Sequence, residues 1–566
     1  MKRALLLFFT SFVFFSVMAI PAKPGLWRVL TLLDGTEVRA ELCGDEFTHY
    51  WKSEDGLCYR ESQQEGFFER CDVTTISERS SAKRQQRSVR NQTRAKLRVN
   101  HTPYTGKKKG LIILVQFSNL SFQESHTKEL YNEILNKENY VNDELGFKGS
   151  VKDYFLAQSN GQFELDFDIV GPLTMPKTYG YYGANDSDGN DSNPGLMTAT
   201  ACEMADEYVN YKDYDWDGDG EVDQVFIIFA GEGEAAGGGA NTIWPHEWHL
   251  QYATGYEKKL TLDETVIDTY ACGPELMRRG SGIQSVVGIE GIGTICHEFT
   301  HCLGIPDMYD TAYNGNSGSP NYGMNRWDLM DQGSYNSGSF IPAGYTSFEK
   351  MSCGWLTPII LENDTTITGM KALSENGEAY ILYNDAHQDE FFLLENRQKT
   401  GWDAGLPGAG LLVIHVDYDE ELWQYNLVNN TTAYNGYNKF QRCTIIAADG
   451  EYASGQEFVA TDPYPYNGNN KLTDNSTPRA YLNNKNSDGK KYMSKPITDI
   501  TLTDGLISFN FKNEVKNRIP AGISSMIVDQ QKDNSSIYDL HGRYMGTELN
   551  ALPKGVYIIG GKKIIK

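Results

Sequence analysis

Positive charge is scarce in this sequence of 566 residues, in which 51 Lys and Arg stand against 75 Asp and Glu, a formal net charge of -24. A surface of that sign repels phosphate backbones and anionic lipid headgroups, so we expect neither nucleic acid nor a membrane surface as a partner. Long apolar runs are also scarce. Only residues 4–20 approach the length that spans a bilayer, so no later segment is expected to insert stably.

That single apolar run has the features of an export signal. Lys2 and Arg3 precede it, and Ala19 ends a small-residue cleavage site, with Ala22 as an alternative. We therefore predict a signal peptide over residues 1–22 and a secreted or cell-surface protein; a permanent anchor is the alternative. No cysteine follows directly, so lipid anchoring is not indicated.

Cysteine is sparse and odd in number. In an exported protein, nine cysteines leave at least one without a partner in the same chain. Cys43, Cys58 and Cys71 are close enough in sequence for one local disulfide. Cys296 and Cys302 are expected on different sides of one helix, which argues against a bond between them.

Histidine is the third scarce residue, yet two of the ten histidines stand four positions apart, in the pattern His297-Glu298-x-x-His301. On a helix that spacing puts both imidazoles on one face, as the first two ligands of a tetrahedral Zn²⁺ require. Glu298 lies about 100° round the helix, where it can act as a general base on a zinc-activated water without being a ligand. Two surface histidines on an ordinary helix are the bland alternative.

The residues after this motif predict a sharp turn. Gly304 tolerates positive φ at a helix end, and Pro306 prevents the helix from continuing. The chain then turns back, which can bring Asp307 to the metal as third ligand, with Asp310 as the fallback.

Residues 297–307 thus read H-E-x-x-H-x-x-G-x-x-D, which resembles the metzincin pattern and is most similar to the immune inhibitor A family of secreted metallopeptidases. The resemblance implies a methionine turn beneath the metal, and Met330 within 327–333 fits it. It also implies a mixed twisted sheet with an active-site helix. Tyr335 is a candidate for polarising a substrate carbonyl. An Asp third ligand departs from the commoner His of metzincins.

The segment before the predicted catalytic domain has two parts. Residues 23–80 contain alternating apolar residues and Asp-Gly turns at Asp34-Gly35 and Asp55-Gly56, which predict short strands. Part of this segment, residues 44–49, resembles the pro-region of the same family, and one of its three cysteines could block the metal as a thiolate; a disulfide or buried thiol is the alternative. Residues 81–109 form a basic linker suited to proteolytic processing.

We expect an α+β multidomain chain. The predicted catalytic domain spans 110–360, with a buried strand over 111–117, a helix capped by Ser150 and another helix over 196–210. Residues 361–515 are expected to be β-rich. Residues 516–566 resemble the C-terminal sorting domains of secreted bacterial proteins, which implies contact with secretion machinery; a plain β-module is the alternative.

Four carboxylates in nine residues indicate a cation site. Asp215, Asp217, Asp219 and Asp223 occupy positions 1, 3, 5 and 9 of a calcium-loop pattern, but the last position of that pattern lacks Glu, so the segment is not an EF-hand. Such carboxylates repel one another unless a cation lies among them, and we predict Ca²⁺. An acidic solvated turn is the alternative.

Three other histidines are expected to bind no metal. His246 and His249, in a Trp-Pro-His segment that recurs in the family, are three residues apart rather than four, and His415 lies on an apolar strand.

The sequence as a whole predicts a secreted zinc endopeptidase made as a zymogen and acting on extracellular proteins. The rival is a non-enzymatic surface adhesin or glycan-binding protein in which a metal only holds the fold.

Overall fold

The computed structural model describes residues 20–45, 49–62, 64, 66–72, 104–186, 189–280, 285–311, 321–431, 438–452, 459–512, 537–539, 544–546, 548–559 and 562–566. Most of the predicted signal peptide, residues 81–103 of the predicted linker and residues 46–48 of the segment resembling a pro-region lie outside them. The chain divides into two compact units, Met1–Glu514 and Val515–Lys566.

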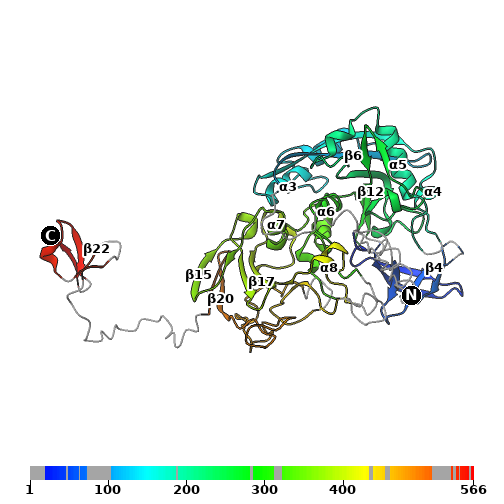
Figure 1. The fold of residues 1–566 in the computed structure, drawn as a ribbon. Coiled ribbons are helices and arrows are strands. Elements are labelled where there is room, and N and C mark those ends of the chain that lie inside the picture. The colour runs from blue at the N-terminus through cyan, green and yellow to red at the C-terminus, as the bar shows by residue number, and fades with distance from the viewer. Residues whose placement is uncertain are drawn as a thin grey trace, which may run out of the picture. The chain divides into compact units, whose positions relative to one another are not determined.

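A five-stranded antiparallel sheet, here called the N-terminal sheet, opens the larger unit (Figure 1). Its strands in sheet order are β1 (Trp27–Thr31), β2 (Glu37–Gly44), β3 (His49–Ser53), β4 (Cys58–Glu61) and β5 (Phe68–Arg70). The two predicted Asp-Gly turns are present, because Gly35 and Gly56 both adopt a φ of +82°, which favours glycine.

The central sheet has the strand order β13-β12-β8-β6-β7, and β9 also pairs with β12. β6, β7, β8 and β12 are parallel, whereas β9 and β13 run antiparallel to β12. The bounds are β6 (Gly106–Gln116), β7 (Phe163–Thr174), β8 (Val225–Glu232), β9 (His246–His249), β12 (Thr269–Arg279) and β13 (Val286–Ile289). The predicted strand over 111–117 therefore corresponds to the C-terminal half of β6, which begins five residues earlier and ends at Gln116.

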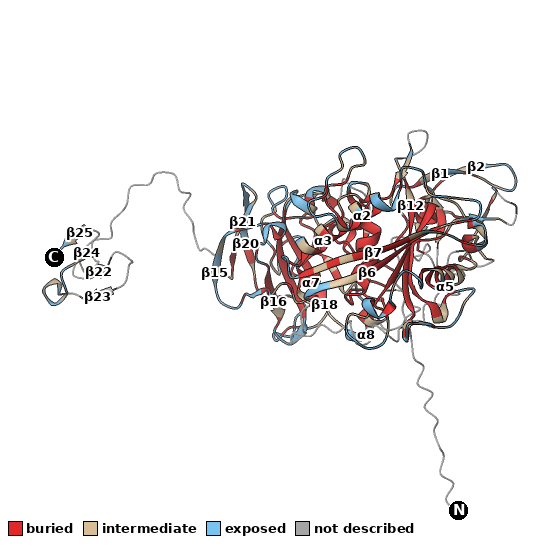
Figure 2. Ribbon diagram, turned by 90° about the horizontal axis from the view of Figure 1, so that it is seen from above, coloured by how far each residue is buried: buried red, intermediate tan, exposed pale blue. Residues whose placement is uncertain are grey.

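Helices cover both faces of this sheet, which explains why β6 is apolar on both sides (Figures 1 and 2). Ile112 and Leu114 of β6 pack in one core with α2 (Lys128–Asn136), α3 (Val151–Gln158) and α6 (Gly293–His301). Leu111 and Ile113 face the opposite core with α4 (Tyr179–Gly183) and α5 (Pro194–Ala205).

Two helices test the predictions for this region. Ser150 caps α3 as expected: its hydroxyl accepts from the Asp153 N–H at 3.0 Å, and the Asp153 carboxylate accepts from the Ser150 N–H at 2.9 Å. The helix predicted over 196–210 instead starts at Pro194, whose fixed φ suits a first turn, and ends at Ala205.

A β-rich layer, made of strands β14 to β21, follows the central sheet in the chain. Some of its buried side chains pack in the same core as α6. One sheet has the order β14-β16-β17-β18-β19 and another the order β15-β21-β20. Leu393, Leu412 and Ile414 from this layer lie in the same buried cluster as Phe299 of α6 and Met330. The core is therefore continuous across the predicted boundary at residue 360. The elements are α7 (Ser347–Ser352), β14 (Ile359–Ile360), β15 (Thr365–Met370), β16 (Tyr380–Asn384), β17 (His387–Arg397), β18 (Gly410–Asp417), α8 (Glu420–Gln424), β19 (Cys443–Ile445), β20 (Ile497–Thr503) and β21 (Leu506–Phe511).

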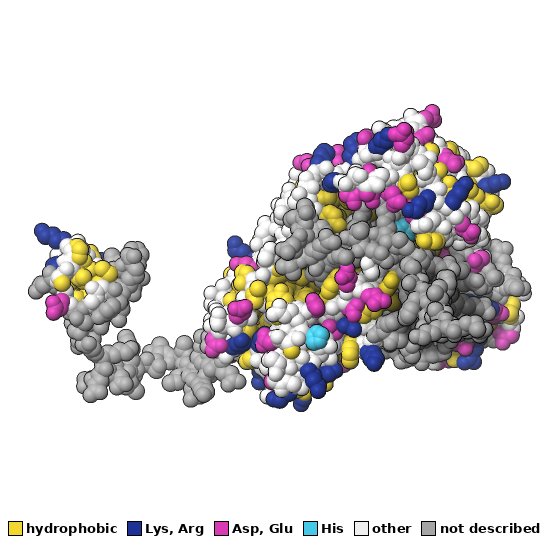
Figure 3. Space-filling model, in the orientation of Figure 1, with side chains coloured by type: hydrophobic (Ala, Val, Ile, Leu, Met, Phe, Trp, Pro, Cys, Tyr) yellow, Lys and Arg dark blue, Asp and Glu magenta, His cyan; other side chains and the backbone are white. Residues whose placement is uncertain are grey.

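Three smaller features complete the described structure. β10 (Leu260–Leu262) and β11 (Thr265–Ile267) form a hairpin. The C-terminal unit is a four-stranded sheet of order β23-β22-β24-β25, with strands β22 (Ile537–Asp539), β23 (Tyr544–Gly546), β24 (Val556–Ile559) and β25 (Lys562–Ile565). Among the described residues, no helix combines the length and apolarity needed to cross a bilayer. Acidic and basic side chains are interspersed on the face shown in Figure 3.

Candidate metal centre

The helix α6 presents the two motif histidines deep inside the larger unit. The helix is fixed by a close approach at its start, because a side chain at Gly293 would lie 2.0 Å from the Ser334 carbonyl oxygen. It ends at His301, and Gly304 then adopts a φ of +79° while its N–H donates to the His301 carbonyl at 2.8 Å. The predicted helix and its glycine turn are both present, and they direct the chain back towards His297.

The turn brings Asp307 against both histidines. Its Oδ1 lies 3.1 Å from His297 Nε2 and 3.6 Å from His301 Nε2. One ligand atom from each of the three residues lies within 4.8 Å of the others, and all three side chains are buried. Asp310, the fallback, is not in this cluster; its carboxylate accepts from the Asn321 N–H at 3.1 Å.

Both imidazoles are oriented through their other nitrogen. His297 Nδ1 lies 2.9 Å from the Leu329 carbonyl oxygen, and His301 Nδ1 lies 2.8 Å from that of Ile305. A carbonyl only accepts, so each Nδ1 carries the proton and each Nε2 presents its lone pair. Neither Nε2 has a hydrogen-bond partner among the described residues. Burial and the neighbouring His297 also hold the pKa of His301 well below its usual range, which keeps that imidazole neutral. This donor set fits a divalent zinc ion.

Glu298 lies beside the cluster rather than in it. Its Oε2 is 4.0 Å from His301 Nε2, and the side chain is buried. The carboxylate is therefore close enough to exchange a proton with a group held at the cluster, as a general base must be.

Met330 lies in a tight turn of the chain. Its N–H donates to Asp328 Oδ1 at 2.7 Å, and its carbonyl accepts from the Met308 N–H at 2.8 Å. The preceding residue, Leu329, supplies the carbonyl that orients His297. This one turn thus supports both the first ligand and the segment that follows the third.

Two contributors to the site had no signal in the sequence. Asn426, which follows α8, bonds Asp307 through both side-chain atoms, with Nδ2 2.6 Å from Asp307 Oδ2 and Oδ1 2.8 Å from the Asp307 nitrogen. Arg397 at the end of β17 is fully buried. Its guanidinium donates at 3.3 Å to the carbonyl of Trp327, the first residue of the segment 327–333 that contains Met330. Both come from the β-rich layer, and such pairings across more than 65 residues leave no periodic pattern in a sequence.

Residues 20–23, which precede the N-terminal sheet, make hydrogen bonds to the part of the chain around the cluster. The Tyr335 hydroxyl, two residues after the segment 327–333, donates to the Pro21 carbonyl at 2.7 Å. The Lys23 N–H donates to the Ala235 carbonyl at 2.9 Å, and the Trp244 indole donates to the Ile20 carbonyl at 3.2 Å. Burial, followed by the carboxyls of Glu290 and Glu298, raises the pKa of Tyr335 well above its usual value, so its hydroxyl stays protonated as a donor.

His49 of β3 makes a second contact between the N-terminal sheet and the rest of the larger unit, through Glu234 and Trp244. His49 stacks on Trp244 with ring centroids 4.6 Å apart, and its Nε2 lies 3.4 Å from Glu234 Oε1. Burial lowers the pKa of His49, but the Glu234 carboxylate and hydrogen bonds outweigh it, so the pKa lies above its ordinary value of 6.5. The pair is therefore strongest when His49 is protonated.

The thiols of Cys43, Cys58 and Cys71 pack around Tyr50 in the N-terminal sheet. Burial raises the pKa of Cys43 and of Cys71 to about 12, and it also raises that of Cys58. Neutral thiols are poor metal ligands, and no described cysteine is part of the metal cluster. The three thiols are buried or half-buried and form no disulfide among the described residues, as the alternative of a buried thiol expects, and the blocking thiolate stays a prediction.

The acidic loop brings together three of its four predicted carboxylates. Asp215, Asp217 and Asp223 each place an oxygen within 4.8 Å of the others. Asp219 is not in this group; its Oδ1 accepts from the Glu221 N–H at 2.9 Å. The Asp215 carboxylate accepts from the N–H groups of Gly218 and Gly220, which rounds the loop ahead of β8.

The three histidines that were expected to bind no metal have structural partners. His246 Nε2 lies 2.9 Å from the Tyr270 hydroxyl, and His249 Nδ1 lies 3.6 Å from Asp268 Oδ2. Neither belongs to a cluster of three metal-ligating groups among the described residues. His415 Nε2 lies 2.9 Å from Glu390 Oε1, which confirms its interpretation as a satisfied structural residue.

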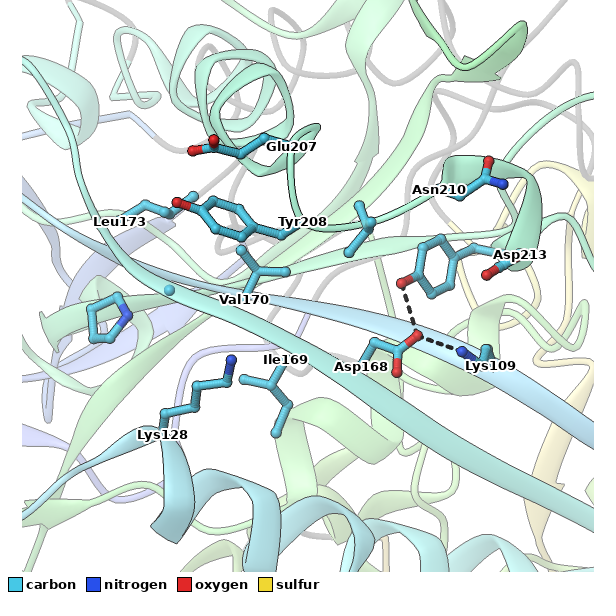
Figure 4. Close-up of a pocket in the computed structure, with 14 residues that line it drawn as sticks. Lys109, Lys128, Asp168, Ile169, Val170, Leu173, Glu207, Tyr208, Asn210 and Asp213 are labelled. Carbon is cyan, nitrogen blue, oxygen red and sulfur yellow. Dashed lines mark hydrogen bonds and ion pairs between the residues drawn. The ribbon is translucent and has the colours of Figure 1, made fainter.

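A surface cavity of about 820 Å³ lies between the exposed side of β7, α2 and the segment after α5 (Figure 4). Its central carboxylate, Asp168, accepts from Lys109 at 2.8 Å and from the Tyr214 hydroxyl at 3.0 Å. The charged groups at its centre are thus already paired, and the cavity contains none of the metal-cluster residues.

Residues 102–357 match the family model described as the immune inhibitor A peptidase M6 catalytic domain. The chain is 28% identical over 275 residues to Immune inhibitor A of Bacillus thuringiensis subsp. alesti, covering 43% of this chain and 38% of that protein. It is 26% identical over 279 residues to Pre-pro-metalloprotease PrtV of Vibrio cholerae serotype O1, covering 43% of this chain and 29% of that protein. The matched region is thus a distant homologue of these metalloproteases, and the chain spans less than two fifths of either one.

Proposed function

We propose that this protein is a secreted zinc endopeptidase that hydrolyses peptide bonds of extracellular proteins and is made as a zymogen. One observation carries the proposal: His297, His301 and Asp307 aim three ligand atoms at one buried point beside Glu298. The match of the surrounding residues to a peptidase catalytic domain supports it.

The roles of the residues follow from their positions. His297, His301 and Asp307 would hold the zinc ion, with the imidazoles fixed by the carbonyls of Leu329 and Ile305. A zinc ion bound there would supply Lewis acidity for the scissile carbonyl and lower the pKa of the attacking water. Glu298 takes the proton from that water and returns it to the leaving amine.

We assign residues 327–333 as the methionine turn, with Met330 buried beneath the metal, because the turn supports His297 through Leu329 and the third-ligand segment through Met308. We keep 110–360 as the catalytic domain, 361–515 as the β-rich domain and 516–566 as a sorting-like module. Each of these boundaries is a prediction, and limited proteolysis with mass spectrometry checks them.

Latency would come from the pro-region, residues 23–80, and its leading segment. Where the signal peptide is removed after Ala19, Pro21 stays in the zymogen, and its carbonyl occupies the Tyr335 hydroxyl, which is suited to a substrate carbonyl. The Glu298 carboxyl helps to raise the pKa of Tyr335, which supports an electrostatic influence of the proposed general base on this contact. Cleavage in the basic linker would separate this segment from the catalytic region and expose Tyr335.

The test compares the full chain before and after a brief trypsin treatment that is stopped with a serine-protease inhibitor. We expect little casein cleavage before treatment and strong cleavage after it. Chelation of zinc should reduce the activity to background, and added Zn²⁺ should restore it. Cleavage that is unaffected by the chelator would refute the zinc assignment.

The rival is a non-enzymatic surface adhesin or glycan-binding protein with a structural metal. A structural zinc site closes with four protein ligands, whereas the cluster found among the described residues has three. Stoichiometric zinc with no cleavage of any unfolded protein after trypsin treatment would favour this rival.

We also propose that Asp215, Asp217 and Asp223 bind Ca²⁺, with Asp219 shaping the loop through the Glu221 N–H. The cation would relieve the repulsion between the carboxylates and hold the loop that precedes β8. Millimolar Ca²⁺ should raise the melting temperature of wild type but not of Asp215→Asn. An equal rise in both proteins would remove calcium from this loop.

Export is the last part of the proposal. The predicted signal peptide at 1–22 would direct the chain out of the cell, and PrtV, a relative, is named as a pre-pro-metalloprotease. The C-terminal unit would engage secretion machinery. Deleting residues 516–566 should leave the activity of the purified enzyme unchanged and stop its appearance in the medium; normal secretion of the truncated chain would contradict this role.

A further inference from the structure

We infer that Asn426 is a positioning residue for the third metal ligand, so that the β-rich layer determines how tightly the catalytic region holds zinc. The inference rests on the proposed function, because it concerns the zinc ion proposed there. It goes further in that it assigns a role to a residue outside the region that matches the peptidase family.

The contact between Asn426 and Asp307 is two-fold and complementary. Asn426 Nδ2 donates to Asp307 Oδ2 at 2.6 Å, while Asn426 Oδ1 accepts from the Asp307 N–H at 2.8 Å. The other carboxylate oxygen, Oδ1, is the one that faces both histidines. The amide thus holds one oxygen of the carboxylate so that the other faces the metal site.

Only a side chain with both a donor and an acceptor at this reach makes the two bonds. An aspartate at 426 would keep the acceptor but direct an oxygen at Asp307 Oδ2, replacing an attraction by a repulsion. The backbone also suits asparagine, since residue 426 has a φ of 50°, a left-handed conformation that Asn and Asp tolerate better than most residues.

The loop that carries Asn426 is itself fixed to the turn that carries Asp307. The Asn426 carbonyl accepts from the Thr311 hydroxyl at 3.0 Å, and Asn429 Nδ2 donates to the Met308 carbonyl at 2.6 Å. Asn429 Oδ1 in turn accepts from the Cys443 N–H at 3.1 Å, at the start of β19. The ligand turn is therefore attached to a sheet of the β-rich layer and not only to α6.

Removing a side chain that hydrogen-bonds to a metal ligand typically lowers metal affinity by about 10–100-fold. We expect Asn426→Asp and Asn426→Ala in the full chain to weaken zinc binding by that factor, measured by competition with a chromophoric chelator. Activity after trypsin treatment should recover at higher free Zn²⁺ with an unchanged KM. Asn430→Ala is the matched control, because Asn430 contacts Thr311 at 3.3 Å in the same loop but not Asp307; its zinc affinity should stay within threefold of wild type.

The melting temperature of the zinc-free proteins separates positioning from folding. A positioning role weakens zinc binding in Asn426→Asp, but not in Asn430→Ala, at a temperature where the melting curves show both zinc-free variants to be fully folded. Unchanged zinc affinity in Asn426→Asp would overturn the inference, whatever its stability. Failure of wild type itself to bind zinc would overturn the proposed function and this inference together, so the two failures are distinguishable. If Asn426→Ala does not fold, Asn426→Asp alone decides, since it has nearly the same shape and tolerates the left-handed backbone.

Discussion

Replacing Glu298 by glutamine is expected to lower kcat/KM for protein cleavage by about 10²–10⁴-fold, the usual contribution of a general base, while zinc content stays at the wild-type level. Glutamine has nearly the same shape as glutamate but cannot accept the proton of the attacking water. The three ligand atoms belong to other residues, so the metal cluster should remain intact.

The measurement pairs casein cleavage after trypsin treatment with the zinc content of the same sample. Glu124→Gln, an exposed residue outside the site, is the matched control and should behave as wild type. Near-normal cleavage by Glu298→Gln would show that another group takes the proton. Loss of zinc along with activity would instead mean that the buried carboxylate helps to hold the metal, and the assignment of separate roles would fail.

Replacing Arg397 by methionine is expected to destabilise the larger unit by about 3–5 kcal/mol, the typical result of removing one partner from a buried ion pair. Arg397 is fully buried and donates to both oxygens of Asp403, at 2.9 and 2.7 Å, and to Glu395 at 2.9 Å. Burial lowers the pKa of Arg397, but the carboxylates of Asp403 and Glu395 outweigh it and raise that pKa above its usual value. Methionine fills much of the volume but leaves two carboxylates buried without their cation.

The destabilisation should also affect the candidate metal centre. The same guanidinium donates to the carbonyls of Trp327 and Gly344, which precede and follow Met330 in the chain. Urea unfolding followed by tryptophan fluorescence measures the change. Arg479→Met is the matched control: Arg479 is exposed and contacts the Tyr492 hydroxyl, so its loss should cost less than about 1 kcal/mol. A loss below 1 kcal/mol for Arg397→Met as well would mean that the buried carboxylates take up protons at little cost.

Local spacing in the sequence was enough to predict the centre of the site. The four-residue interval between His297 and His301 has one outcome on a helix, and Gly304 with Pro306 has few alternatives to a turn. The buried strand within β6 and the cap at Ser150 were predictable for the same reason. In each case the relevant interaction lies within about one turn or one strand, where backbone geometry determines which side chains meet.

The remaining features depended on contacts between residues far apart in the chain. The motif already favoured Asp307 over Asp310, but the hydrogen bonds that hold Asp307 in place came only with the structure. The burial of the N-terminal cysteines likewise came only with the structure. Asn426, Arg397 and the contact between Pro21 and Tyr335 join segments separated by up to 314 residues. A single hydrogen bond between such segments imposes no period on either one, so the sequence alone determined the helix that carries the two motif histidines, and only the tertiary structure decided what positions it and what covers it.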